Sequence, residues 1–285
     1  MADQAEKLRE LVKKTKKQCR VIAITSGKGG VGKTSVSVNL SLALSARGAK
    51  VILVDADLGL GNIEVLMGLH SFYNLAHVIE GSKKLDEIIL KAPLGLEVVP
   101  GSSGLSRIAD LTDKEREKLL NALFDLCERS EFLVLDTMAG IGKNTVSFCT
   151  SADEVIVVTT PEPSAIVDAY AIVKTIYLQR DDTTIKLIVN MAVNSAQAQA
   201  VANKLLNVAQ QYLSKNIIYL GHIQRDIHVN QSIMQSQPLF ITFPNAPATK
   251  CIETIAQRLY FQKPTEVEFK KTGFMKRLVK SFGWA

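Results

Sequence analysis

A glycine-rich loop near the N-terminus constrains this chain more than any other feature. The run from Gly27 to Thr34 reads GKGGVGKT, a glycine followed after four intervening residues by Gly-Lys-Thr. The apolar run at 21–25 before it is typical of a buried strand, and the residues at 35–44 after it are typical of a helix. Strand, glycine loop and helix in this order form a phosphate-binding loop. A flexible glycine turn is the alternative, and the flanking strand and helix argue against it.

The loop's chemistry suits a nucleoside triphosphate. Glycines let backbone N–H groups curl around phosphate oxygens, and the positive end of the following helix faces the same anion. Lys33 should reach the β- and γ-phosphates, and the Thr34 hydroxyl should ligate Mg²⁺. The expected ligands are therefore a nucleoside triphosphate and Mg²⁺. The nucleotide-contacting residues expected here are Gly27, Lys28, Gly29, Gly30, Val31, Gly32, Lys33, Thr34 and Ser35.

Carboxylates should lie beside this loop. A buried-strand pattern at 51–54 runs into Asp55-Ala56-Asp57, and another at 132–135 ends in Asp136. Parallel sheets bind ligands at the carboxyl ends of their strands, and carboxylates there can support Mg²⁺. We expect Asp136 to be the Walker B carboxylate, which holds Mg²⁺ through a water. A solvated pair at a strand end is the alternative for Asp55 and Asp57.

Strand and helix patterns alternate along the rest of the chain. Its 285 residues, 47% hydrophobic and 22% charged, suffice for one large domain. We predict an α/β fold: a doubly wound, mainly parallel sheet of the P-loop NTPase type with terminal amphipathic helices. The expected divisions are an N-terminal helix at 1–20, a nucleotide-binding domain at 21–261, and a linker and C-terminal helix at 262–285.

Charge and cysteine content limit the expected binding partners and the expected cellular compartment. The net charge is +6, with +4 in residues 1–20 (seven Lys/Arg, three acids) and +4 in 262–285 (six against two), which leaves −2 for the body. Basicity confined to two terminal segments favours surface docking over nucleic-acid binding. The four cysteines lack Cys-x-x-Cys spacing, which argues against zinc and disulfides. The charged N-terminus is not a signal peptide, and no apolar run spans a bilayer. We expect a reducing bacterial cytoplasm.

Lys28 makes the loop Lys-Gly-Gly-Val-Gly-Lys-Thr, which resembles the deviant Walker A motif of the MinD/ParA ATPases. The resemblance implies that Lys28 contacts the nucleotide of a second subunit, so that ATP closes a face-to-face homodimer. A solvated loop lysine is the alternative.

The same resemblance assigns further roles. It implies that Asp55 supports the Mg²⁺ shell and that Asp57 orients the attacking water, so Asp57, Lys28 and Lys33 are the expected catalytic residues. It places switch segments at 58–62 and 137–142. It also implies that Asn190, at the end of a strand expected at 185–190, hydrogen-bonds adenine, with an ordinary turn asparagine as the alternative.

Three segments resemble the FlhG-type flagellar number regulators within that family: 3–9, 100–104 and 161–170. The first carries Asp3, Gln4, Ala5, Leu8 and Arg9 as Asp-Gln-Ala-x-x-Leu-Arg. The resemblance implies that this motif stimulates a signal-recognition-type flagellar GTPase, and it allows a flagellar transcription regulator or a motor-ring protein as a further partner. A helix that only caps the body is the alternative.

The C-terminal segment predicts an amphipathic helix. One arc carries Phe274, Met275, Leu278, Val279 and Phe282, and the other carries Lys276, Arg277 and Lys280. This pattern is typical of an interfacial membrane helix and resembles the MinD membrane-targeting sequence. A helix docked on the body is the alternative, and the two states could alternate with the nucleotide.

These features predict a slow ATPase switch that dimerises with ATP, binds the inner face of the bacterial membrane and limits flagellar number or placement. The alternatives are a MinD-like division-site selector, a ParA-like DNA-partitioning ATPase and a non-catalytic ATP-binding scaffold.

Overall fold

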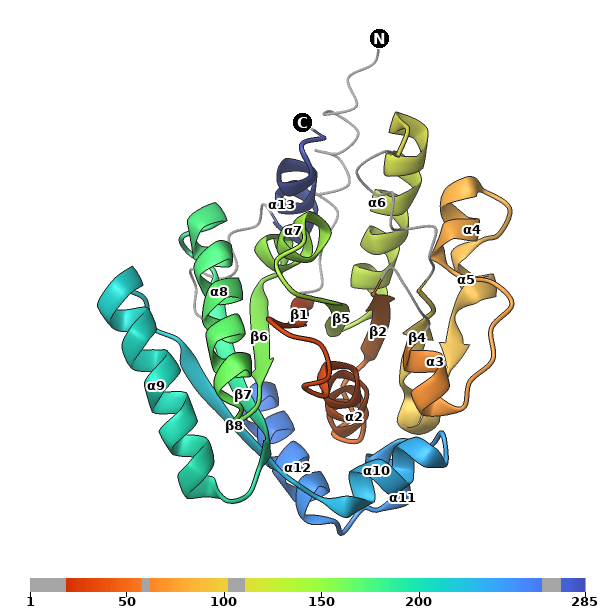
Figure 1. Ribbon diagram of the computed structural model, residues 1–285. Helices are drawn as coiled ribbons and strands as arrows, with labels where there is room; N and C mark the ends of the chain where they lie inside the picture. The colour runs from red at the N-terminus through yellow and green to blue at the C-terminus, as the bar shows by residue number, and fades with distance from the viewer. Residues whose placement is uncertain (1–18, 58–61, 102–110, 263–272, 285) are drawn as a thin grey trace.

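The computed structural model describes residues 19–57, 62–101, 111–262 and 273–284, and these form a layered α/β domain (Figure 1). Eight strands make one sheet in the order β3-β4-β2-β5-β1-β6-β7-β8. The strands are β1 Arg20–Ser26, β2 Val51–Ala56, β3 Leu90–Lys91, β4 Glu97–Val99, β5 Phe132–Ala139, β6 Glu154–Thr159, β7 Thr184–Ala192 and β8 Ile218–Gln224.

Helices connect the strands and cover both faces of the sheet. They are α2 Lys33–Ser45, α3 Asn62–Met67, α4 Leu75–Glu80, α5 Leu85–Ile88, α6 Asp113–Arg129, α7 Lys143–Ser151, α8 Pro163–Gln179, α9 Ser195–Leu213, α10 Ile227–Met234, α11 Leu239–Thr242, α12 Pro247–Phe261 and α13 Gly273–Phe282, with a 3-10 turn at Pro93–Gly95. None of these described helices is both long and apolar enough to cross a bilayer.

The sheet is parallel except for β3, which pairs antiparallel with β4. Its central strands are mainly apolar and are buried along most of their length because helices cover both faces. Alternate residues of each strand enter different core layers: Val21 and Ala23 pack toward α6, α7 and α8, whereas Ile22 and Ile24 pack toward α2 and α12. The predicted doubly wound, mainly parallel α/β fold is confirmed.

Local signals in the sequence explain several helix ends. Thr112 and Glu115 form the capping box that starts α6. Asn74 caps α4, and Gly81 ends it in the left-handed conformation at φ 88°. These residues satisfy backbone groups that a helix terminus leaves unpaired.

The structure differs from the sequence-based boundaries at three places. Residues 137–139, predicted to belong to a switch, continue β5 because they keep pairing with β1 and β2. The strand β7 runs two residues past Asn190. Arg20, counted with the basic N-terminal segment, lies inside β1.

The buried position of Arg20 has a clear cause. Its guanidinium donates to Glu154 Oε1 at 2.5 and 2.9 Å and to the Leu259 carbonyl at 2.8 Å. Lys186 Nζ donates to the other oxygen of Glu154 at 2.6 Å and to Gln262 at 2.7 Å. Each buried charge thus has a partner, and the network fixes the end of α12 against the sheet.

Candidate nucleotide site and C-terminal helix

The glycine-rich loop joins β1 to α2 at the carboxyl edge of the sheet. Gly30 and Gly32 have φ values of 80° and 83°, which favour glycine. A Cβ on Gly27 would lie 2.0 Å from the Asp168 carbonyl oxygen, so glycine is required where α8 crosses the loop. Val31 is buried, and Thr34 and Ser35 lie half-buried in the first turn of α2. This is the strand–loop–helix arrangement that the sequence predicted.

Lys33 is buried and reaches the Walker B position. Its Nζ donates to Asp136 Oδ1 at 2.9 Å, with the two side chains 7% and 0% exposed. The same ammonium lies 3.4 Å from Thr34 Oγ1. The lysine that should bind phosphates therefore has a carboxylate partner here.

Asp55 and Asp136 are neighbours in register on β2 and β5. Burial, and then the charge of Asp136, raise the pKa of Asp55 to about 7, while backbone N–H groups of Asp57 and Ile63 lower it. The two buried carboxylates repel one another, and the Lys33 ammonium offsets part of this charge through its bond to Asp136 Oδ1.

The residues present fit a Mg²⁺ ion. Asp136 Oδ2 is buried and has no hydrogen-bond partner among the described residues. Oxygen ligands from Asp55, Asp136 and the Thr34 hydroxyl are those that Mg²⁺ prefers, mostly through water. The unpaired oxygen of Asp136 would be a suitable acceptor for a hydrated cation at this edge.

Asp57 follows directly after β2. Its N–H donates to Asp55 Oδ1 at 3.0 Å, and its Oδ2 lies 3.5 Å from the Asn62 amide nitrogen. Asn62, the last residue of the expected first switch, is the first residue of α3, and 58–61 lie outside the described residues.

Lys28 points away from the loop toward the start of α8. Its Nζ is 2.9 Å from Ser164 Oγ and 3.4 Å from Glu162 Oε2. The Lys28 and Glu162 side chains are 41% and 68% exposed, so this pair is weak and easily exchanged.

Asn190 lies beside the loop. Its amide nitrogen donates to the Val31 carbonyl at 2.8 Å, and a Cβ on Gly32 would lie 2.4 Å from that nitrogen. The bond orients the side chain and leaves Oδ1 as an acceptor, the group that an adenine amino group requires.

The helix α13 is docked on α7 (Figure 1). Four of its five predicted membrane-facing side chains are buried and Val279 is half-buried; the buried ones are Phe274, Met275, Leu278 and Phe282. The Phe282 ring meets Phe148 of α7 edge-on at 5.4 Å. In this structure the apolar arc contacts protein, as in the docked alternative, because burying it removes apolar surface from water.

Polar contacts also hold α13. Arg277 donates to Asp153 Oδ1 at 2.5 Å and to the Ser151 carbonyl at 2.7 Å. Within the predicted basic arc, Lys276 and Lys280 are exposed, whereas the Arg277 side chain is only 19% exposed. Ser281 contacts Ser147 and Thr150 of α7. These bonds therefore fix the position of α13 along α7.

Known proteins of similar sequence assign this chain to a family. A family model described as an AAA domain matches residues 19–189. The antiactivator FleN of Pseudomonas aeruginosa is 39% identical over 84% of this chain and 86% of its own length. The flagellum site-determining protein YlxH of Helicobacter pylori is 36% identical over 93% and 91%. This chain belongs to the MinD/ParA ATPase family, in its group of FlhG-type flagellar regulators.

The solved structures agree with this membership. The septum site-determining protein MinD of Pyrococcus horikoshii, solved with Mg-ADP, superposes with a TM-score of 0.70 at 25% identity, over 89% of the FlhG-type chain and all of MinD.

Sequence reasoning missed several residues of this FlhG-type chain that contact the candidate site or the docked helix. Ser37, which donates to Asp136, and Asp153, which binds Arg277, carry no local motif. Glu162 and Ser164 lie in a segment that was singled out, but nothing in the sequence pairs them with Lys28. The predicted activator residues Asp3, Gln4, Ala5, Leu8 and Arg9 lie outside the described residues.

Proposed function

We propose that this chain is an ATP-dependent switch that dimerises, binds an anionic membrane surface and regulates flagellar number or placement. Its family membership and its relatives, an antiactivator named FleN and a flagellum site-determining protein, support the flagellar role. The observation that carries the proposal is the docked α13: the arc that would enter a membrane packs on α7, which begins four residues after β5 ends.

Nucleotide binding would use the loop residues 27–35. Lys33 would leave Asp136 for the β- and γ-phosphates, and Thr34, Asp55 and Asp136 would hold Mg²⁺, which neutralises phosphate charge when bound. Asp57 would orient the attacking water, and Asn190 Oδ1 would accept from adenine. Hydrolysis would be slow, as suits a switch.

Dimerisation would use the exposed Lys28. The weak contacts to Glu162 and Ser164 would break when the lysine reaches the partner's nucleotide, at small cost. Two tails released in one dimer would bind a membrane together, which raises avidity far above that of one helix.

On membrane attachment, the apolar arc of α13 would leave α7 and contact lipid instead. Phe274, Met275, Leu278, Val279 and Phe282 would insert. Lys276, Arg277 and Lys280 would each contribute about 1 kcal/mol near anionic lipids.

The first experiment is co-sedimentation with liposomes containing anionic lipid, with ATP, with ADP, and with a chain lacking 273–285. Binding that requires ATP and is lost on truncation would support the switch. Equal binding with either nucleotide, or no binding, would contradict it.

A sharper variant alters the dock and leaves the helix intact. Asp153→Asn weakens the ion pair to Arg277 yet retains an acceptor for the Val21 N–H. We expect it to raise membrane binding with ADP toward the level with ATP. Asp181→Asn, which removes an exposed partner of Lys215, is the control and should behave as the unchanged chain.

The N-terminal motif would stimulate a signal-recognition-type flagellar GTPase, with Arg9 or the helix as a whole acting on the partner's site. Adding a peptide of residues 1–20 to that GTPase should raise its turnover, and an Arg9→Ala peptide should not.

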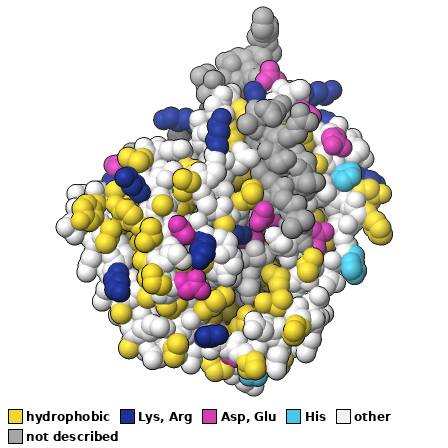
Figure 2. Space-filling view, viewed as in Figure 1, with side chains coloured by type: hydrophobic (Ala, Val, Ile, Leu, Met, Phe, Trp, Pro, Cys, Tyr) yellow, Lys and Arg dark blue, Asp and Glu magenta, His cyan; other side chains and the backbone are white. Residues whose placement is uncertain are grey.

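The alternatives make different predictions. A DNA-partitioning ATPase needs a basic dimer surface, whereas on the face seen in Figure 2 Lys and Arg side chains of described residues are scattered among acidic and apolar ones.

A non-catalytic scaffold would tolerate Asp57→Ala, so an Asp57→Ala chain that binds ATP, dimerises and restores flagellar number in a deletion strain would favour the scaffold. A MinD-like selector would act on division in the same strain.

A further inference from the structure

Ser37 lies one turn into α2 and is fully buried. Its hydroxyl is 2.6 Å from Asp136 Oδ1 and 3.1 Å from the Lys33 carbonyl. A hydroxyl carries one hydrogen, and the shorter bond to a carboxylate is the stronger, so Ser37 donates to Asp136.

Asp136 therefore has an asymmetric environment. Oδ1 accepts from both Lys33 and Ser37, whereas the buried Oδ2 has no partner among the described residues. Two donors on one oxygen fix the rotation of the carboxylate. We propose that Ser37 is the positioning residue of the Mg²⁺ site, holding Oδ1 of Asp136 so that Oδ2 stays available to the hydrated cation.

The need for Ser37 follows from the competing demands on Lys33. One ammonium cannot remain on Asp136 and also reach the phosphates of a nucleotide, so Lys33 leaves Oδ1 when nucleotide binds. Ser37 is then the remaining donor to that oxygen seen in the structure. Its hydroxyl acts in the nucleotide-bound state, where the orientation of Asp136 decides cation affinity.

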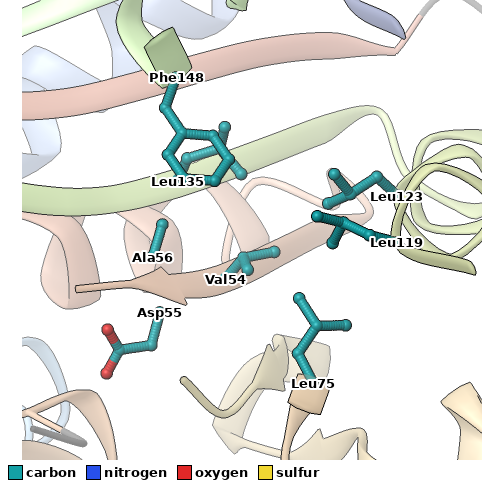
Figure 3. A pocket seen from close by; sticks show the side chains of 8 residues that line it. All are labelled: Val54, Asp55, Ala56, Leu75, Leu119, Leu123, Leu135 and Phe148. Carbon is teal, nitrogen blue, oxygen red and sulfur yellow. The ribbon is translucent and has the colours of Figure 1, made fainter. Parts of the chain in front are cut away.

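The neighbouring strand β2 supplies no replacement for Ser37 in the ionised site. Asp55 is the adjacent carboxylate in register, and its charge repels that of Asp136. Figure 3 shows the Asp55 carboxylate turned away from the apolar side chains behind it. Those side chains line a small cavity and offer no donor; they are Val54, Ala56, Leu75, Leu119, Leu123, Leu135 and Phe148.

The test is a Mg²⁺ titration of the binding of a fluorescent ADP derivative to the full chain, with Mn²⁺ as a second cation followed by its own spectroscopic signal. Removing a partner of a metal ligand costs about 10–100-fold in metal affinity. We expect Ser37→Ala to raise the half-saturating Mg²⁺ and Mn²⁺ concentrations by about 10-fold or more, with ADP binding in the absence of cation unchanged.

The chain offers a matched control. Ser41 lies one turn further along the same helix, is equally buried, and its hydroxyl has no partner among the described residues. Ser41→Ala should leave both cation titrations unchanged. Ser37→Thr keeps the hydroxyl and should stay within about twofold of the unchanged chain.

A further variant covers the case in which Ser37→Ala does not fold. Ser37→Cys keeps the size of the side chain but is a weak donor, and should shift the titrations in the same direction. Unchanged half-saturation in Ser37→Ala or Ser37→Cys, or an equal shift in Ser41→Ala, would overturn the role of Ser37.

The inference rests on the proposed Mg-nucleotide site, and the two fail differently. If ADP binding by the chain without substitutions does not depend on Mg²⁺ or Mn²⁺, both the proposed site and the role of Ser37 are overturned. If that binding depends on the cation but Ser37→Ala has the same half-saturating concentrations, only the positioning role is overturned.

Discussion

The nucleotide edge and the docked C-terminal helix place buried charges in opposite situations. At the edge, Lys33 is the one cation among the described residues that forms an ion pair with Asp55 or Asp136, and Asp136 Oδ2 has no hydrogen-bond partner among them. At α13, Arg277 meets Asp153 on the rim of an apolar contact centred on Leu278. Under the proposed function, a bound cation would relieve the repulsion at the edge, whereas α13 would have to lose its contacts with α7 before it could bind a membrane.

This difference suits a switch. A ligand that relieves repulsion at one site supplies binding free energy. A helix whose apolar arc can contact either protein or lipid needs only a small difference in free energy to shift from one state to the other. The predictions below separate the two regions, from the largest expected effect to the smallest.

Lys33→Ala should weaken ATP binding by about 100-fold or more, because hydrogen bonds to charged groups contribute about 1.5–3 kcal/mol each. Isothermal titration with ATP and Mg²⁺ would measure the loss. Lys28→Ala in the same loop is the control: it should bind ATP within a few-fold of the unchanged chain yet fail to dimerise. An equal loss in both variants would contradict the separate roles.

Asp55→Asn should stabilise the metal-free chain at pH 8. The folded state raises the pKa of Asp55 from 3.8 to about 7, so it binds a proton more tightly than the unfolded state. The free energy of unfolding should therefore fall by about 1.4 kcal/mol per pH unit as the pH rises from about 4 to 7, a total of a few kcal/mol. Above pH 7 it should stay at the lower value.

Urea unfolding at pH 5, 6, 7 and 8 without divalent cations would show this slope in the unchanged chain and its loss in Asp55→Asn. The half-buried Asp57→Asn should keep the slope. The same slope in all three chains would show that Asp55 is not its source.

Leu278→Ala should weaken the docking of α13 by about 2 kcal/mol, since Leu→Ala at a buried position costs about 2–5 kcal/mol and a terminal helix can detach. Trp284, the single tryptophan, stacks on Phe282 at 5.0 Å and reports on docking. Its emission should shift to longer wavelength with ADP bound, while ATP affinity stays unchanged. The exposed Lys276→Ala is the control, and a Leu278→Ala spectrum identical to it would refute a dock centred on Leu278.

Glu162→Gln should change the free energy of unfolding by less than about 0.5 kcal/mol, because its pair with Lys28 is exposed. It should favour the ATP-bound dimer slightly by freeing Lys28, which sedimentation equilibrium would measure. Dissociation of the dimer in this variant would instead assign Glu162 to the interface.

The outcome at α13 shows where sequence reasoning stops. An amphipathic pattern fixes which side chains share an arc, and that prediction is confirmed for Phe274, Met275, Leu278 and Phe282. It does not say whether lipid or protein covers the arc, because both are apolar. The contacts with α7 and the carboxylate of Asp153 hold the docked state, and both come from distant parts of the chain.

The loop, the strand patterns and the aspartates at strand ends could be read from sequence because each depends on neighbours a few residues apart. Strand, turn and helix periods are local, and a parallel sheet brings every carboxyl end to one edge. Residues 137–139 were misjudged because β5 continues only where β1 and β2 are long enough to pair with it.

The sequence by itself thus determined the fold class, the family and the strand–loop–helix arrangement of the glycine-rich loop, since these follow from short-range patterns and motif spacing. The tertiary structure alone decided which groups meet: Ser37 and Lys33 on Asp136, Asn190 on Val31, Lys28 on Ser164, and Arg277 on Asp153. The physical reason is that hydrogen bonds and ion pairs act over about 3 Å, and only folding brings residues that far apart in sequence within that distance.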